Sequence, residues 1–99
     1  MTSRPTGARI ICDAGFKAAG KGAPDPELVG IEIPHSVQFS AEHGVITLSD
    51  EVSQPQVGAT IEFVPGYSDA VIFLHDYLYG IRDGFVETIW PIIGRGKLQ

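Results

Sequence analysis

The stretch DYLYGIRDGFVETIW, residues 76–90, gives the clearest structural signal in the sequence. Asp83 and Gly84 separate two segments rich in β-forming residues, and Asp-Gly supplies the positive φ angles that a two-residue hairpin turn needs. We therefore predict a C-terminal β-hairpin with strands over 76–82 and 85–90.

Short apolar segments earlier in the chain repeat this pattern of strands divided by turns. The segment 28–33 alternates β-branched and other residues, as a half-buried strand does, and the segment 42–44 is typical of a short turn. Within 60–64, regular alternation places Ile61 and Phe63 together on the core face. We predict strands over 8–12, 28–33, 37–39, 45–48 and 60–64.

Two segments do not follow the strand pattern. Residues 16–26 contain glycines and prolines, which favour positive φ angles or remove backbone donors, so we predict a loop there. The apolar run 71–74 is too short for periodicity to assign, and a helix fits it as well as a strand does.

Together these segments predict a mainly β fold. Ninety-nine residues allow one hydrophobic core, and 43% hydrophobic against 19% charged residues are enough to form it. Short strands punctuated by Gly and Pro, without a long amphipathic helix, indicate a small β-barrel or sandwich of about six to eight short strands with little helix. We expect a flexible lead-in over 1–7 and a single β domain over 8–99.

Charge and composition exclude several classes of function. A formal net charge of −5 and a pI near 4.9 disfavour nucleic acid, since phosphate binding needs clustered Lys and Arg. No run approaches the roughly 20 apolar residues of a membrane helix, and the first residues lack the apolar core of a signal peptide. Cys12 is the sole cysteine, so no intrachain disulfide can form. We expect a cytoplasmic protein that binds neither nucleic acid nor membrane.

The titratable residues form no catalytic constellation in the sequence. Of His35, His43 and His75, only the last two adjoin a carboxylate, and adjacent strand residues face opposite ways, so neither pair is a natural chelate. No nucleophile elbow and no glycine-rich phosphate cradle occurs. The turn 65–69 either presents polar side chains from a rigid strand end or simply ends the strand. From the residues alone we assign no catalytic and no cofactor-binding residue.

Several motifs, taken in order, resemble one known family. They are Asp13-Ala14-Gly15-Phe16-Lys17, Glu42-His43-Gly44, Val57-Gly58 with 61–65, and the segment 86–97. From residue 10 to residue 97 the chain is similar to the C-terminal domain of the D-threonine aldolase and D-serine dehydratase family, relatives of alanine racemase.

This resemblance implies an N-terminal barrel that carries pyridoxal phosphate and its Schiff-base lysine, and a β domain that helps to close the active site. The barrel is absent from this sequence, and Lys17 does not match the Schiff-base lysine. Because the electron-sink chemistry belongs to the cofactor, we expect no aldol cleavage or dehydration from this chain alone.

The resemblance also implies metal ligands in the loop after the Val-Pro strand, where the family has a His followed shortly by a Cys or an Asp. Tyr67 occupies the His position and Asp69 matches the acidic ligand position. A protonated phenol is a poor ligand for zinc or manganese, and one carboxylate holds such an ion weakly. Asp69 is therefore the one metal-ligand candidate, in a site that we predict to be broken.

Two functions follow from this comparison of motifs. The first is a stand-alone, non-catalytic relative of the C-terminal domain that acts as a binding or interaction module. The alternative is a component of a pyridoxal-phosphate- and metal-dependent amino acid aldolase or dehydratase, a lyase, whose barrel is a separate chain or is missing here. A third function, ligand binding by a protein that has kept this family's fold, is the one we favour least. We expect no cofactor on the isolated chain; pyridoxal phosphate and a divalent metal would enter only with a barrel partner.

The expected partners follow from the same comparison. A domain that packs against a barrel in its family exposes apolar surface when the barrel is absent, and twofold symmetry is the commonest way to cover such a surface. We predict a homodimer, with a pyridoxal-phosphate barrel protein as the other possible partner. The contact is expected at the terminal hairpin, around Tyr77, Tyr79, Phe85 and Trp90.

Overall fold

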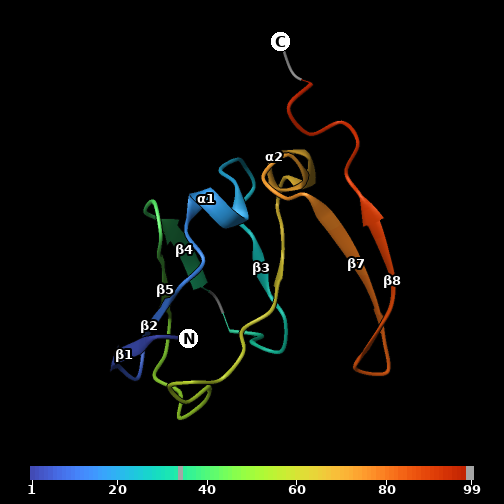
Figure 1. The fold of residues 1–99 in the computed structure, drawn as a ribbon. Helices are drawn as coiled ribbons and strands as arrows, with labels where there is room; N and C mark the ends of the chain where they lie inside the picture. The colour runs from blue at the N-terminus through green and yellow to red at the C-terminus, as the bar shows by residue number, and fades with distance from the viewer. Residues whose placement is uncertain (34, 98–99) are drawn as a thin grey trace.

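A four-stranded antiparallel sheet forms the centre of the domain (Figure 1) in a computed structural model that describes residues 1–33 and 35–97. Its strands lie in the order β1-β2-β5-β4. Their bounds are Ser3–Thr6 for β1, Arg9–Cys12 for β2, His35–Phe39 for β4 and Gly44–Leu48 for β5. The strands predicted on either side of the turn 42–44 are confirmed by β4 and β5, and β2 confirms the strand predicted over 8–12.

One face of this sheet carries the hydrophobic core. Ile46 lies opposite Ile10 on β2 and opposite Val37 on β4, so three branched side chains meet across adjacent strands. Ile10 and Ile46 are fully buried. The buried cluster consists of Ile10, Cys12, Leu28, Val37, Ile46 and Leu48.

A second, two-stranded sheet covers part of this core. It pairs β3 (Glu27–Leu28) with β6 (Phe63–Val64), and Leu28 lies opposite Phe63. Leu28 is buried, and the Phe63 ring meets the Phe39 ring of β4 edge to face at a centroid distance of 6.2 Å. This aromatic contact joins the second sheet to the first.

Two short helices lie at one end of the molecule (Figure 1). These are α1 (Phe16–Ala19) and α2 (Ser68–Ile72), and α2 contains the first half of the run 71–74. His75, which follows α2, places its Nε2 atom 2.7 Å from the carbonyl oxygen of Ala18 in α1 and so connects the two. Within the described ranges, no helix has the length and apolar character needed to cross a membrane.

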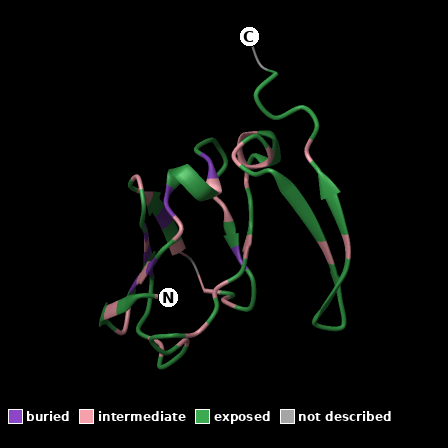
Figure 2. Cartoon of the chain, viewed as in Figure 1, coloured by how far each residue is buried: buried purple, intermediate pink, exposed green. Residues whose placement is uncertain are grey.

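The C-terminal hairpin forms a third sheet, which stands to one side of the other two (Figure 1). Its strands are β7 (Tyr77–Arg82) and β8 (Phe85–Pro91). Asp83 and Gly84 join them with φ angles of 50° and 79°, as the sequence predicted. None of the residues in these two strands is buried (Figure 2).

The prediction of a mainly β fold is confirmed, with two corrections. The strands of the described residues form three separate sheets and do not close into a barrel. The expected flexible lead-in differs from the structure, because residues 3–6 form β1 and pair with β2. The Thr2 amide donates to the Ile11 carbonyl at 2.9 Å, and the Met1 ammonium donates to the Ala59 carbonyl at 2.8 Å. These contacts hold the N-terminus against distant parts of the chain.

Two predicted strands are shorter than the sequence suggested. The segment 28–33 contributes only its first residue to β3, because the chain turns at Gly30 with a φ of 76°. The segment 60–64 is reduced to β6, since its partner β3 offers only two residues for pairing. Ile61 and Phe63 nevertheless both pack against the core, as the alternation predicted. The predicted loop 16–26 begins with α1.

Close backbone packing between two loops fixes the segment that precedes α2. A Cβ atom on Gly66 would overlap the Pro24 carbonyl oxygen, and one on Gly22 would lie 2.9 Å from the Tyr67 Cβ atom. Neither glycine has a positive φ angle, so the requirement at both positions is space. Packing against the segment 20–26 therefore fixes the backbone position of residues 66 and 67.

This packing predicts that Gly66→Ala destabilises the domain by more than about 2 kcal/mol, because the methyl group must displace the backbone of the neighbouring loop. Gly94→Ala is the matched control: a Cβ atom there meets nothing within 4 Å, so the change should stay within about 0.5 kcal/mol. Urea denaturation of both variants measures the difference. Equal stabilities would show that the two loops are not in contact in solution.

Candidate functional site

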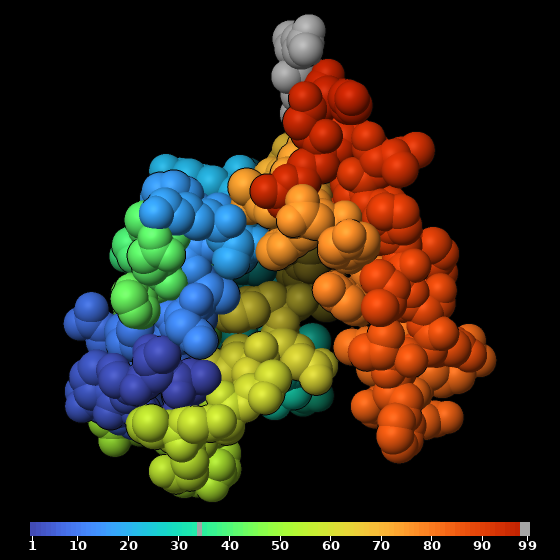
Figure 3. Space-filling view, in the orientation of Figure 1, coloured from blue at the N-terminus to red at the C-terminus, as the bar shows by residue number. Residues whose placement is uncertain are grey.

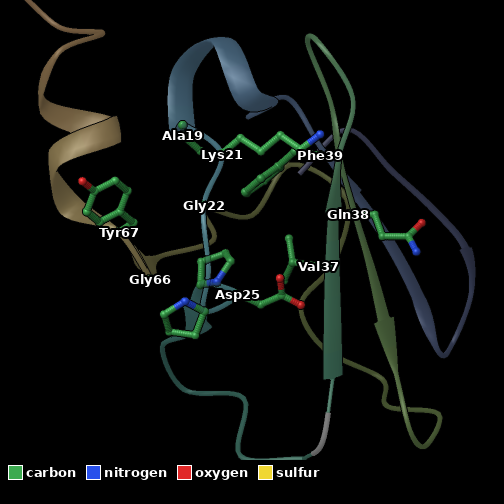
Figure 4. Close-up of a pocket in the computed structure, with 12 residues that line it drawn as sticks. Ala19, Lys21, Gly22, Asp25, Val37, Gln38, Phe39, Gly66 and Tyr67 are labelled. Atoms are coloured by element: carbon green, nitrogen blue, oxygen red, sulfur yellow. The ribbon is translucent and has the colours of Figure 1, made fainter.

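A cavity of about 300 Å³ lies between the loop 19–26 and strand β4 (Figure 4). Gly66 and Tyr67 complete its lining. A volume of this size is at the lower end of the range for small-molecule sites in proteins. A second cavity, of about 430 Å³, lies between the segments 29–31 and 60–62. We describe the first as a candidate binding site because it borders Tyr67, the motif position before α2.

Apolar side chains of β4 form the floor of the cavity. Val37 and Phe39 are two residues apart on one strand, so both project to the same face, towards the loop (Figure 4). Val37 is buried and Phe39 is half-buried. Gln38 lies between them and points to the other side of the strand, so its amide does not enter the cavity.

Two opposite charges extend from the loop towards this floor. The Lys21 stem runs beside the Phe39 ring, and the Asp25 carboxylate lies beside Val37 (Figure 4). Both residues are exposed. The cavity thus has a positive and a negative group, separated by apolar side chains.

The segment from Tyr67 to Asp69 lies at the edge of this site. Tyr67 precedes α2 in an extended conformation and is 52% exposed. Its ring lies on the other side of the loop from Lys21 and Asp25, and its hydroxyl points away from them (Figure 4). Asp69 is exposed in the first turn of α2.

Comparison with known proteins assigns the chain to a family. Residues 1–81 match the family model described as a putative serine dehydratase domain. The chain belongs to this family. The resemblance identified in the sequence to the D-threonine aldolase and D-serine dehydratase family is thereby confirmed.

Relatives within this group are aldolases. The chain is 36% identical over 96 residues to a D-threonine aldolase of an Arthrobacter species, covering 97% of this chain and 25% of that protein. It is 37% identical over 87 residues to a 3-hydroxy-D-aspartate aldolase of Paracoccus denitrificans, covering 88% of this chain and 22% of that protein. The chain spans about a quarter of the length of these curated relatives.

A solved relative has the same fold. The crystal structure of D-threonine aldolase from Filomicrobium marinum superimposes with a TM-score of 0.85 at 28% sequence identity. The match covers 99% of this chain and 27% of that one. The serine dehydratase-like domain is therefore a distinct part of a longer enzyme in this relative.

The residues present in this serine dehydratase-like domain do not fit a divalent metal. Within 1–33 and 35–97, no group of three or more His, Cys, Asp and Glu side chains is placed to hold an ion. His35 Nδ1 lies 3.0 Å from the Ile33 carbonyl oxygen, and His75 is bound to α1, so neither imidazole joins Asp69. The predicted ligand position at Asp69 has only the Tyr67 phenol as its motif neighbour.

Lys17 does not fit a Schiff-base role either. Lys17 forms an ion pair with Glu42, and both side chains are more than 60% exposed. This pair brings two of the family motifs together, but a solvated pair of this kind contributes little to stability. A Schiff-base lysine is usually desolvated or beside another cation, whereas Lys17 is exposed and beside a carboxylate.

The C-terminal segment of the family motif has a structural role in this chain. Arg95 Nε lies 3.0 Å from Asp76 Oδ1, and its guanidinium also donates to the Leu74 carbonyl oxygen. Arg95 thereby ties the end of the chain to the start of β7. The sequence identified this arginine only as part of a motif.

Sequence reasoning missed the cavity residues Lys21 and Asp25. Both lie in a segment that was predicted only as a loop, and neither belongs to a motif. The spacing of Pro24 and Pro26 around Asp25 was the one available signal, because two prolines restrict the backbone of the residue between them.

We predict that the chain binds Zn²⁺ and Mn²⁺ weakly or not at all, because Tyr67 stands at the position where the resemblance implies a His, and a phenol is a poorer ligand than an imidazole. Calorimetric titration measures this directly. Tyr67→His should strengthen binding, since it supplies a nitrogen ligand two residues from the Asp69 carboxylate. Tight stoichiometric binding by the unaltered chain, lost in Asp69→Ala, would contradict the prediction.

Proposed function

We propose that this domain is a non-catalytic interaction module that docks, through the β7–β8 hairpin, onto the pyridoxal-phosphate barrel of an aldolase or dehydratase acting on a D-amino acid. The barrel would bring the cofactor, which stabilises a substrate carbanion, together with the lysine that holds it. The domain would pack against the barrel and form one side of the active site.

The observation that carries this proposal is the exposed apolar surface of the hairpin. In the register of the ladder, Tyr79 lies opposite Ile89, and Leu78 lies opposite Trp90 on the other face. Exposed fractions run from 44% at Leu78 to 77% at Phe85. The large hydrophobic residues exposed on the two strands are Tyr77, Leu78, Tyr79, Ile81, Phe85, Val86, Ile89 and Trp90.

Such a surface is costly for a free hairpin. A two-stranded hairpin is at best marginally stable in water unless a hydrophobic face packs against something else. Burial of one large apolar side chain contributes about 1.5–3 kcal/mol, so docking one face of the hairpin against a partner stabilises it by several kcal/mol. Both faces of this hairpin carry apolar residues, which favours a position between two surfaces.

The choice of a barrel as the partner rests on the relatives. They are aldolases about four times as long as this chain, and the aligned part covers only 25% of the Arthrobacter enzyme. The remaining three quarters of such an enzyme is the natural surface for the hairpin to contact. Lys17 is held in an exposed ion pair with Glu42, and no three possible metal ligands come together among the described residues. Both observations favour a structural role for the domain over a chemical one.

The test is a chimera in which this chain replaces the matching quarter of the Arthrobacter D-threonine aldolase. We expect Tyr79→Thr with Ile89→Thr to lower the stability of the chimera by about 2 kcal/mol or more, because these residues would contact the barrel. Threonine keeps a high β propensity, so the hairpin itself should survive. Thermal unfolding and aldolase activity provide the readouts.

Val57→Thr is the matched control, because Val57 is 61% exposed and lies outside the hairpin. It should leave the chimera unchanged. A chimera that is equally stable with and without the hairpin substitutions would contradict docking on the barrel. If light scattering then shows a dimer of the free chain that the same substitutions disperse, the surface belongs to a second copy.

A further inference from the structure

We propose that the free edge of β4 accepts one extended polypeptide segment of a partner protein, as an added β-strand in the space between β4 and the loop 19–26. The segment would place a small apolar side chain beside Val37, an acidic residue towards Lys21 and a basic residue towards Asp25. This surface lies on elements other than the hairpin, so the inference goes beyond the proposed function and does not depend on it.

The hydrogen-bond pattern of the central sheet directs the backbone groups of Val37 and Phe39 away from β5. The amide of Ser40, which follows β4, donates to the His43 carbonyl across the turn at 2.8 Å, so residue 40 bonds on the β5 side. Successive residues of an antiparallel strand point their N–H and C=O groups alternately to the two sides. The groups of residues 37 and 39 therefore point to the free edge of β4.

These edge groups have no hydrogen-bond partner in the described parts of the chain. Neither a backbone nor a side-chain group within 1–33 and 35–97 pairs with the N–H or C=O of Val37 and Phe39 at this edge. Val37 as a whole residue is only 6% exposed, so its backbone is largely shielded from water. Shielded backbone groups are normally paired, and a row of unpaired ones is a template for another strand.

The two edges of the central sheet differ in how they are protected. On β1, Pro5 and an irregular register with β2 interrupt the edge, and Arg4 donates to the carbonyls of Gly7 and Pro55. Proline and irregular pairing prevent the addition of a further strand. β4 pairs regularly with β5 over five residues and contains no Pro, Lys, Arg, Asp or Glu. Of these two edges, β4 is therefore the one suited to accept a strand.

The loop 19–26 restricts what can pair with this edge. It faces β4 across the cavity of about 300 Å³ (Figure 4) and lies side by side with the segment 63–72 (Figure 3). Close packing of Gly66 on Pro24 holds the loop in this place. Neighbouring strands lie roughly 5 Å apart, so one extended segment needs little width, whereas a second copy would bring a whole sheet against the loop. A single segment is therefore the expected occupant.

The side chains around the cavity specify the sequence pattern of the segment. Opposite residues of an antiparallel pair share one face, so the residues opposite Phe39 and Val37 lie on the cavity side. Lys21 lies beside Phe39, and Asp25 lies beside Val37 at the other end of the apolar floor (Figure 4). A segment that runs antiparallel to β4 meets Lys21 first, the apolar floor next and Asp25 last. Alternate residues that are acidic, small apolar and basic match this order.

Both charged residues of the cavity are available for these contacts. Lys21 and Asp25 are exposed, and the ion pairs of the described residues involve neither of them. Opposite charges attract and like charges repel across an interface, so the order of charges along the segment sets its direction.

The acetylated and amidated peptide Glu-Thr-Val-Thr-Lys carries this pattern and serves as the probe. Titrated into ¹⁵N-labelled protein, it should cause saturable shifts of the Val37 and Phe39 amides. These shifts should exceed those of the Ser36 and Gln38 amides, which bond to β5. The absence of saturable shifts at Val37 and Phe39 at millimolar peptide would overturn the proposal.

N-methylation of the peptide separates backbone pairing from side-chain contact. Methylating the nitrogen of the central Val should weaken binding by about tenfold or more, because it removes the donor to the Val37 carbonyl and places a methyl group against the edge. The nitrogen of the second Thr points away from β4, so its methylation is the matched control and should change the affinity by less than about twofold. Equal losses from both methylations would rule out an added strand.

Reversing the charges tests the assignment of Lys21 and Asp25. The peptide Lys-Thr-Val-Thr-Glu, blocked in the same way, should bind the unaltered chain about fivefold more weakly, because like charges then face each other. The double variant Lys21→Glu with Asp25→Lys keeps the net charge, and both positions are exposed, so the fold should survive. This variant should prefer the reversed peptide. If it still prefers the original peptide, the proposed contacts are wrong.

The dependence on protein concentration identifies a second copy as the occupant. In the absence of peptide, the Val37 and Phe39 amides should keep their positions across a dilution series. If they shift as the protein is concentrated, and light scattering shows a dimer over the same range, β4 pairs with another copy and the proposal fails.

Discussion

The contact of Ile10, Ile46 and Val37 across β2, β5 and β4 is the interaction on which the rest of the domain depends. These branched side chains are buried on one face of the central sheet, and their burial stabilises the fold. The β3–β6 sheet packs against the same face through Leu28 and the Phe63–Phe39 contact. Val37 belongs both to this core and to the cavity floor. The core therefore fixes one residue of the cavity floor, while the charged residues of the cavity lie on a loop.

The central sheet and the C-terminal hairpin differ in how far they bury their apolar residues. The central sheet places them inside, whereas the hairpin presents them to solvent on both faces. Arg95 and the turn at Asp83 and Gly84 give the hairpin a defined shape without giving it a core. A surface of this kind is expected of a part that completes its packing against another body, and the chain matches only a quarter of the aldolases to which it is similar.

The sequence predicted those elements whose signals are local. Asp83-Gly84 specified the hairpin turn, and alternation predicted the strands on either side of the turn 42–44. It did not predict β1, because that strand is held by contacts with residues far along the chain, such as that between Met1 and Ala59. The cavity was missed for the same reason: the approach of Gly66 to Pro24 joins segments some forty residues apart and leaves no periodic pattern.

The central claim, that the hairpin is an incomplete surface which a partner completes, is tested most directly by hydrogen exchange of the β7 and β8 amides. At a concentration where light scattering gives a monomer mass, these amides should exchange at least about a hundredfold faster than those of β5 in the free chain. In the chimera with the Arthrobacter barrel they should slow by a similar factor. Hairpin amides already as protected as those of β5 in the monomer, or equally fast in the chimera, would contradict the account.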